Sequence, residues 1–146
     1  MKAGQYLTFR LMENSYAIGI EKVREINRLK EIAKVPESPD YISGVINLRG
    51  KIIPVMDLRK RLQLGAMAAT KQSCIIVIES HQRQMGIIVD SVTAVIDLNS
   101  DQIDASPLCA NQGSFMQSIG KLDDHLILLL DIDQFLAPDD NLSKSA

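Results

Sequence analysis

The residue types that most often carry catalysis occur here without partners at a useful spacing. The only histidines are His81 and His125, and the only cysteines are Cys74 and Cys109. A general base or a nucleophile needs convergent groups around it, and there is no Cys-x-x-Cys pair to support a zinc or redox site. We therefore expect surface histidines, cysteines in or near the core, and no catalytic residue, metal site or cofactor site.

Paired carboxylates give no better case for metal chemistry. Asp123-Asp124 falls where a turn is expected, and Asp139-Asp140 lies in a polar C-terminal stretch. Neither pair has the spaced oxygen ligands of a calcium loop. A phosphate-binding loop is not indicated either, because the segment from Gly44 to Gly50 is not followed directly by a helix.

One acid and one base stand where they could meet another protein. Glu25 lies at the end of an expected strand, and Arg49 lies at the tip of an expected hairpin. Opposite charges beside a groove between two modules could fix the register of a binding partner. The alternative is an ordinary surface salt bridge, worth about 0–1 kcal/mol. Composition alone favours that simpler interpretation.

Composition excludes several classes of function. The chain has 146 residues with 16 Lys+Arg against 18 Asp+Glu, three Tyr, three Phe and no Trp. A formal net charge of −2 and so few aromatic rings argue against nucleic-acid binding, which uses basic surfaces and stacking platforms. No apolar run approaches the ~20 residues that span a bilayer, and no signal peptide is evident. We expect a cytoplasmic protein that does not insert into a membrane.

The elements that must position these residues are organised as an internal repeat. Residues 6–26 match residues 75–95 at an offset of 69 without a gap, apolar on apolar. Residues 48–62 then match residues 122–136 at an offset of 74. Two ungapped matches in the same order indicate a duplicated module.

Each half is expected to consist mainly of strands. Leu7–Leu11 and Ile18–Ile20 alternate with a period of two, which is typical of half-buried strands. Ile75–Ile78 and Ile87–Val89 are continuous β-branched runs, which suit strands covered on both faces. Short strands, tight turns and two copies predict an all-β protein of two small antiparallel barrels with about five strands each.

Turns, caps and boundaries follow from the same pattern. Arg49-Gly50 predicts a tight hairpin, in which Gly50 takes a positive φ. Asp57 and Asp131 are each expected to cap a short helix. We place the first barrel subdomain at residues 1–66, the second at residues 67–138 and a polar tail at residues 139–146, with a linker at Gln63–Gln72. Strands can be exchanged between the two subdomains of what is one domain overall.

Three segments then carry a resemblance to a known family. They are Tyr16-Ala-Ile-Gly-Ile-Glu-Lys-Val-Arg-Glu-Ile26, the stretch at residues 39–59 that contains Asn47-Leu-Arg-Gly50, and Gly86-Ile-Ile-Val-Asp-Ser-Val92. Together they resemble the CheW family of chemotaxis coupling proteins, and the similarity runs from about Gln5 to Pro138. The resemblance implies two SH3-like antiparallel five-stranded barrel subdomains with a few short helices. It also implies an adaptor and not an enzyme.

The resemblance further implies partners and contact residues. Proteins of this family bridge the cytoplasmic tips of chemoreceptors, the methyl-accepting chemotaxis proteins, and the regulatory domain of a CheA-type histidine kinase. A cytoplasmic protein that is monomeric when free and recruited to membrane-associated receptor arrays is expected. The positions that match receptor-coupling positions of the family are Val23, Glu25, Gly44, Arg49, Val92 and Val95. For the apolar members, core packing is an equal explanation.

The mechanism expected from this resemblance is geometric, and it has competitors. A groove between two barrels could take an amphipathic helix along an apolar floor, with charges at its rim that set the orientation. The same fold also serves chemosensory pathways that govern pili or second messengers. A small-barrel nucleic-acid binder is disfavoured by a pI of about 5.6, and an enzyme would need a polar pocket with perturbed groups.

Overall fold

Strands dominate the part of the chain that the computed structural model describes, which comprises residues 3–65, 70–105 and 116–135. The strands are β1 (Gly4–Leu11), β2 (Asn14–Gly19), β3 (Val23–Arg28), β4 (Ile42–Leu48), β5 (Lys51–Asp57), β6 (Cys74–Ser80), β7 (Arg83–Val89), β8 (Ser91–Leu98), β9 (Ile103–Ala105), β10 (Met116–Leu122) and β11 (His125–Leu130). The short helices are η1 (Ile20–Lys22), α1 (Leu58–Arg61), η2 (Ser100–Gln102) and α2 (Ile132–Phe135). The predicted all-β class with a few short helices is confirmed.

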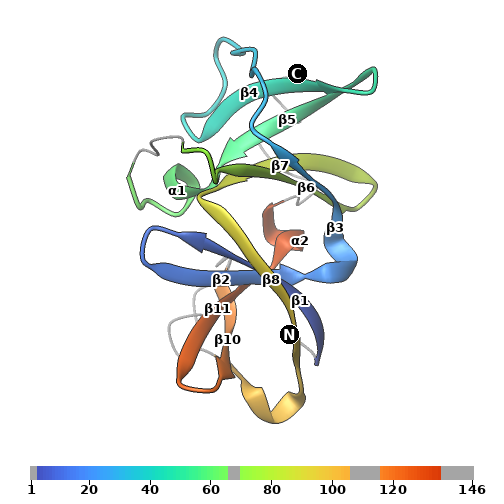
Figure 1. The fold of residues 1–146 in the computed structure, drawn as a ribbon. Coiled ribbons are helices and arrows are strands. Elements are labelled where there is room, and N and C mark those ends of the chain that lie inside the picture. The colour runs from blue at the N-terminus through green and yellow to red at the C-terminus, as the bar shows by residue number, and fades with distance from the viewer. Residues whose placement is uncertain (1–2, 66–69, 106–115, 136–146) are drawn as a thin grey trace.

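The strands form two sheets, and each sheet takes strands from both halves of the chain (Figure 1). One sheet has the order β8-β1-β2-β11-β10-β9, and the other has the order β3-β6-β7-β5-β4. The hairpin β1–β2 therefore lies with the second half of the chain, and the hairpin β6–β7 lies with the first. The expected division into residues 1–66 and 67–138 separates the two copies of the repeat but does not separate the two sheets.

The repeat seen in the sequence is also a repeat of structure. A shift of 69 residues carries β1, β2 and β3 onto β6, β7 and β8, and a shift of 74 carries β4, β5 and α1 onto β10, β11 and α2. The same exchange of labels converts the strand order of one sheet into that of the other. The two sheets are thus two copies of one topology, and each serves as an internal control for the other.

Two details differ from antiparallel five-stranded barrels. Each sheet contains one parallel pair, β2 with β11 and β5 with β7, because the exchanged hairpin enters beside a strand that runs in its own direction. The sheet with β1 also has a sixth strand, β9, which pairs with β10. In the other sheet the corresponding contact is a single bridge between Ala33 and Val45.

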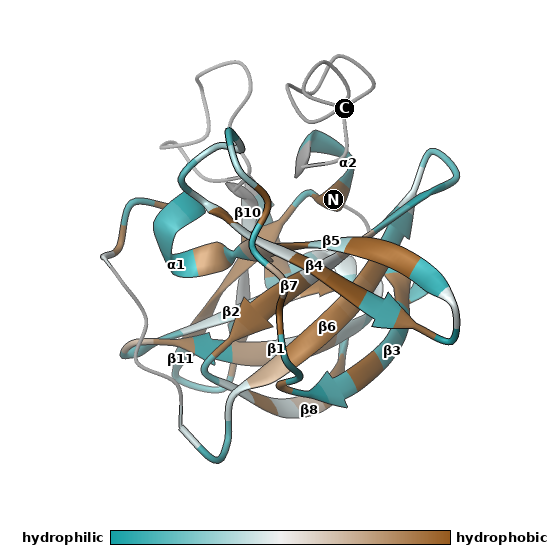
Figure 2. Cartoon of the chain, turned by 90° about the horizontal axis from the view of Figure 1, so that it is seen from above, coloured by the Kyte–Doolittle hydropathy of each residue, from teal (hydrophilic) through white to brown (hydrophobic). Residues whose placement is uncertain are grey.

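Apolar side chains form three clusters, of which the one between the sheets draws on the most strands. Figure 2 shows the hydrophobic residues along the strands, with hydrophilic residues at the turns. The central cluster includes Leu7, Phe9, Leu11, Tyr16 and Ile18 from one sheet and Ile42, Met56, Ile76, Ile78, Met85, Ile87 and Val89 from the other. A second cluster fills the sheet with β5, and a third fills the sheet with β11. Because full burial of one such side chain stabilises by about 1.5–3 kcal/mol, the central cluster binds the two sheets into one folding unit.

Candidate functional site

Glu25 and Arg49, which the sequence placed on separate elements, contact one another. Glu25 lies on β3, one edge of the five-stranded sheet, and Arg49 lies in the turn between β4 and β5 at the other edge. Arg49 Nη1 donates a hydrogen bond to Glu25 Oε1 at 3.2 Å, and Arg49 Nη2 donates to Glu25 Oε2. This bidentate ion pair joins the two edges of the sheet and so helps to close it.

A β-bulge aims Glu25 at this position. Val23 pairs with Ile78, whereas Glu25 pairs with the adjacent Val77, so Arg24 is the extra residue. Val23 packs against the central cluster, while Val77 belongs to the cluster inside the five-stranded sheet. Directly paired residues share a face of the sheet. Glu25 is therefore on the inner face, and its side chain is 25% exposed.

The turn that carries Arg49 is backbone-constrained. Arg49 has φ +52° and Gly50 has φ +85°, the positive values that a two-residue hairpin turn needs at both positions. Asn47 Oδ1 accepts a hydrogen bond from Gly50 N at 2.8 Å. Glycine, Asn and Asp adopt such values with least strain. An arginine at this position is therefore not chosen for the turn itself.

Electrostatics keep this pair ionised. The hydrogen bonds from Arg49, and next from Asn27, lower the pKa of Glu25 to about 2. The hydrogen bond to Glu25 and its charge raise the pKa of Arg49. The Arg49 side chain is 73% exposed, so the guanidinium is available to a protein that binds from outside.

Gly44 has a backbone role. It lies in β4 with φ +146°, and a Cβ atom on it would come within 2.1 Å of the Ala33 carbonyl oxygen. That approach exists because Ala33 and Val45 exchange two backbone hydrogen bonds of 2.9 Å. A substitution here would push the chain away from β4, which gives a structural explanation for this site residue.

The remaining apolar site residues lie on β8 in the other sheet. Val92 pairs with Phe9 and packs against the central cluster, as Val23 does from β3. Val95 is 50% exposed. The structure thus brings Glu25 and Arg49 into contact, places Val23 and Val92 on one shared core, and leaves Val95 at the surface.

The expected apolar groove between the barrels is filled by the central cluster. At the surface of the junction lies a polar cavity of about 270 Å³. Its lining residues are Arg10, Met12, Arg59, Thr70, Gln72, Ser73, Asp90 and Ser91. An apolar helix would find no apolar floor in this cavity. A helical partner must therefore bind the outer surface of the sheets.

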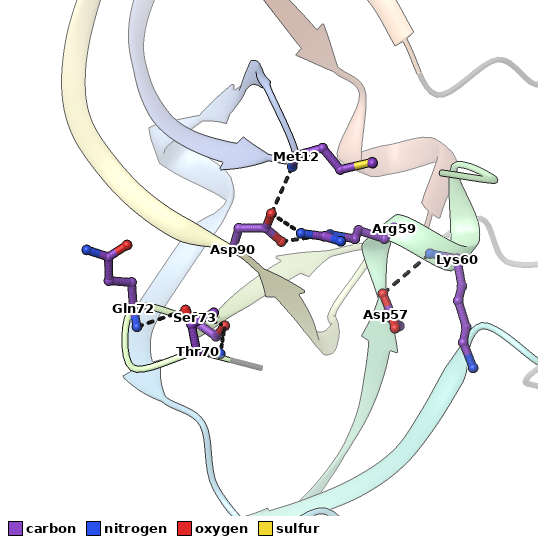
Figure 3. Close-up of polar contacts among 8 residues, drawn as sticks. All are labelled: Met12, Asp57, Arg59, Lys60, Thr70, Gln72, Ser73 and Asp90. Carbon is purple, nitrogen blue, oxygen red and sulfur yellow. Dashed lines mark hydrogen bonds and ion pairs between the residues drawn. The ribbon is translucent and has the colours of Figure 1, made fainter. Parts of the chain in front are cut away.

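Sequence analysis missed Asp90, which holds the junction together (Figure 3). Asp90 lies where the chain crosses from β7 in one sheet to β8 in the other. Its carboxylate accepts hydrogen bonds from Arg59 Nε at 2.9 Å and from Met12 N at 2.8 Å. Burial raises the pKa of Asp90, but these hydrogen bonds outweigh burial, and the pKa lies below its ordinary value. The coincidence of Asp90 with Glu21 in the repeat was the available signal.

The basic cluster on α1 was expected to be a solvated face, and it divides into three different contacts. Arg59 pairs with Asp90 and is only 18% exposed. The Arg61 guanidinium lies 4.6 Å from the centre of the Tyr41 ring. Lys60 Nζ is 3.8 Å from an oxygen of Asp40, whose side chain is 91% exposed.

A second ionic contact occurs at the equivalent junction. Lys22, in the segment where the chain crosses from β2 to β3, has its Nζ 3.1 Å from Asp133 Oδ1 on α2. Ser80 Oγ donates a hydrogen bond to the same carboxylate. The hydrogen bond from Ser80, together with Lys22, lowers the pKa of Asp133 against the effect of burial.

The residue types considered for chemistry are placed as follows. His81 and His125 are exposed, as predicted, and Cys74 is half-buried; Cys109 and the tail at 139–146 lie outside the described residues. Within the described ranges, no three His, Cys, Asp or Glu side chains are grouped so that they could hold a metal ion. No helix in the same ranges is long and apolar enough to cross a membrane.

Comparison with known proteins adds to this geometry. The chain matches the family model of the CheW-like domain over residues 5–139. It is 33% identical to the chemotaxis protein CheW of Klebsiella aerogenes, over 97% of this chain and 89% of that protein. It is 33% identical to the chemotaxis protein CheW of Bacillus subtilis, over 100% and 94%. The crystal structure of the scaffolding protein TtCheW from Thermoanaerobacter tengcongensis matches with a TM-score of 0.84 and 36% identity, covering 96% of this chain and 97% of that one.

Fold and site together define an all-β scaffold of two SH3-like barrels with strands exchanged between them. An exposed, fully ionised side-chain pair at the rim of one barrel suits recognition of another protein. The chain belongs to the CheW-like domain family, which makes it an adaptor of the chemotaxis type.

Proposed function

We propose that this protein is a non-enzymatic, cytoplasmic adaptor that couples chemoreceptors to a CheA-type histidine kinase. The observation that carries the proposal is the ion pair between Glu25 and Arg49. It joins two edges of one sheet and still presents a guanidinium that is 73% exposed. A charged rim of this kind orients a helical partner more than it adds to fold stability.

The six site residues have different roles in this proposal. Glu25 and Arg49 contact the cytoplasmic tip of the receptor, and the exposed Val95 extends the contact onto the other sheet. Val23 and Val92 act from beneath, because both pack against the central cluster and hold β3 and β8 in place. Gly44 allows the close approach of residue 33 to β4.

Coupling requires no chemistry by the adaptor. It requires that the adaptor contact receptor and kinase differently in their active and inactive states. An adaptor that binds both proteins within an array gains from the high effective concentration of its neighbours, so each separate contact can be weak. A single rigid unit with a shared core, as found here, suits a scaffold that must hold two partners at a fixed geometry.

The test is sedimentation of the protein with membranes that carry a chemoreceptor, with and without the kinase. Glu25→Lys and Arg49→Asp should each lower the sedimented fraction and leave the thermal midpoint nearly unchanged, because the pair is exposed. Lys121→Asp is the matched control, since Lys121 forms an exposed ion pair with Asp104 on the other sheet.

A charge-swapped variant separates recognition from structure. Glu25→Arg combined with Arg49→Glu restores an ion pair with reversed polarity. If the receptor recognises the charges, this variant binds no better than the single variants. Sedimentation of both single variants at the level of the unmodified protein would reject the site.

A further inference from the structure

The internal repeat provides a comparison for the rim that carries the receptor site. Three positions on the rim of the five-stranded sheet are polar or charged, and they differ from their equivalents in the other half. The equivalent pairs are Glu25 and Ala94, Asn27 and Ile96, and Arg49 and Asp123. The third pair even shares its backbone conformation, with φ +52° and φ +54°.

In the second half, these positions are filled mostly without charge. Ile96 packs against the cluster inside the six-stranded sheet. Ala94 exchanges hydrogen bonds with the hydroxyl of Thr8 through its backbone, at 2.9 and 3.1 Å. The same topology can therefore close around an alanine and an isoleucine. The polar residues at positions 25 and 27 are not demanded by the fold, which points to a function in binding.

Asn27 is the member of this set that sequence reasoning did not single out. It lies two residues after Glu25 on β3, so the two side chains share a face. Asn27 Nδ2 donates a hydrogen bond to Glu25 Oε1 at 2.9 Å. The same oxygen accepts the hydrogen bond from Arg49 Nη1 at 3.2 Å. The carboxylate is thus held along the strand by Asn27 and across the sheet by Arg49.

This arrangement controls where the Arg49 guanidinium points. The side chain of Arg49 is long and 73% exposed, and among the described residues its hydrogen bonds go to Glu25 alone. A flexible cation loses rotamer entropy when a partner immobilises it, and prior anchoring removes part of that cost. Any group that fixes the Glu25 carboxylate therefore also fixes the cation that a partner meets.

We infer that Asn27 is a positioning residue of the receptor site, which holds the Glu25 carboxylate in the orientation that anchors Arg49. The inference rests on the proposed function, because the benefit of anchoring appears only when a receptor binds. Its direct consequence for Glu25, a carboxylate with one donor more than the ion pair supplies, exists in the free protein. The lowered pKa of Glu25, to which Asn27 contributes after Arg49, agrees with this arrangement.

The repeat itself suggests the variant to make. Asn27→Ile introduces the residue that stands at the equivalent position, Ile96, and removes the donor. Asn27→Asp keeps the shape and replaces the donor by a second carboxylate, and Asn27→Gln retains an amide donor. Arg28→Gln is the matched control, since Arg28 is the next residue on β3 and lies on its exposed face.

Three measurements decide the outcome. Carbonyl-carbon NMR titration of Glu25 in the free protein should show its pKa raised in Asn27→Ile, raised further in Asn27→Asp and largely restored in Asn27→Gln. Sedimentation with receptor-bearing membranes should show affinity lowered about three- to tenfold in Asn27→Ile, the range for one hydrogen bond. Urea unfolding should show stability kept or increased in Asn27→Ile, because an apolar residue then covers the apolar cluster.

The two proposals fail in distinguishable ways. If unmodified protein does not sediment with the receptor membranes, the proposed function is wrong. The Glu25 titration then still decides whether Asn27 holds that carboxylate. If the unmodified protein binds and Asn27→Ile binds equally well, or if the pKa of Glu25 is the same in Asn27→Ile as in the unmodified protein, the positioning role is overturned. A loss of stability in Asn27→Ile with an unchanged pKa would likewise assign Asn27 to the fold alone.

Discussion

At each junction between the sheets, the short helix of one half contacts the segment through which the other half crosses between sheets. On one side, α1 contributes Arg59 and the crossing segment contributes Asp90. On the other side, α2 contributes Asp133 and the crossing segment contributes Lys22. The place of the contact is the same in both copies, but the sign of the charge on the helix is reversed.

This reversal shows which properties the repeated fold specifies. The topology fixes that a helix side chain meets the crossing strand, while either polarity of the pair satisfies that contact. The two contacts also differ in depth, with side-chain exposures of 18% and 20% for Arg59 and Asp90 against 31% and 43% for Lys22 and Asp133. The contact at α1 should therefore contribute more to stability, because screening by solvent weakens exposed pairs.

Truncation of the core tests how far the two copies act as one unit, and it should have the largest effect. Phe9 and Ile78 occupy equivalent places in the repeat, and both are fully buried in the central cluster. We expect Phe9→Ala to lower the free energy of unfolding by about 3–5 kcal/mol and Ile78→Ala by about 2–5 kcal/mol. Urea unfolding, followed by circular dichroism, measures both.

The shape of the transition carries the comparison. Because both residues lie in the cluster shared by the sheets, each variant should unfold in one cooperative step. An exposed site such as Ile52→Ala, with 60% exposure, is the control and should change stability by less than about 0.5 kcal/mol. Two resolved transitions in either core variant would mean that the sheets unfold separately, which contradicts the shared core.

Removal of the ionic contacts sharpens the comparison between the junctions, with an intermediate effect. Arg59→Ala leaves the Asp90 carboxylate without its guanidinium and should cost about 1.5–3 kcal/mol, the range for hydrogen bonds to charged groups. Lys22→Ala removes a more exposed pair and should cost about 0–1 kcal/mol. Differential scanning calorimetry and urea unfolding at pH 7 give both values.

A reversed pair tests whether polarity matters. Arg59→Asp with Asp90→Arg gives the α1 junction the polarity that the α2 junction already has. This double variant should recover part of the stability lost in Arg59→Asp alone. If the double variant is no more stable than that single variant, then Met12 N and the local geometry require a carboxylate at position 90, and the two junctions are not interchangeable.

The sequence was sufficient to predict the repeat, the all-β class and the meeting of two distant charges. The turns show where it was less precise: the first hairpin turn was expected at Asn14-Ser15, but Asn14 already pairs with Leu11 and the turn lies at Met12-Glu13. Local turn propensity favours Asn, whereas the register is fixed by the buried face of the strands. The exchange of hairpins could not be derived, because the repeat makes the two partner sheets nearly equivalent in pattern.

The site shows the same limit. Glu25 and Arg49 could be named from motif and charge, but the role of Asp90 depends on a crossing between sheets that no local pattern encodes. The groove was predicted from the idea of two separate barrels, and a shared core replaces it because the exchanged hairpins bring apolar faces from both sheets together. Long-range pairing, and not residue type, carried the missing information.

The smallest expected effect concerns acid and the one barrel rim that carries an ion pair. The pKa of Glu25 in the folded protein is about 2, below its ordinary value of 4.5, so the unfolded chain binds this proton more readily. Stability from Glu25 is therefore fully present above about pH 4.5 and is lost as the pH falls toward 2. Glu25→Gln should lower the urea midpoint slightly at pH 7, and the difference from the unmodified protein should vanish across that window. Glu13→Gln, at an exposed acid in the turn between β1 and β2, should show no such convergence. A difference that stays constant from pH 7 to pH 2 would mean that the ion pair does not form in solution, and the polar rim would then resemble its uncharged equivalent around Ala94.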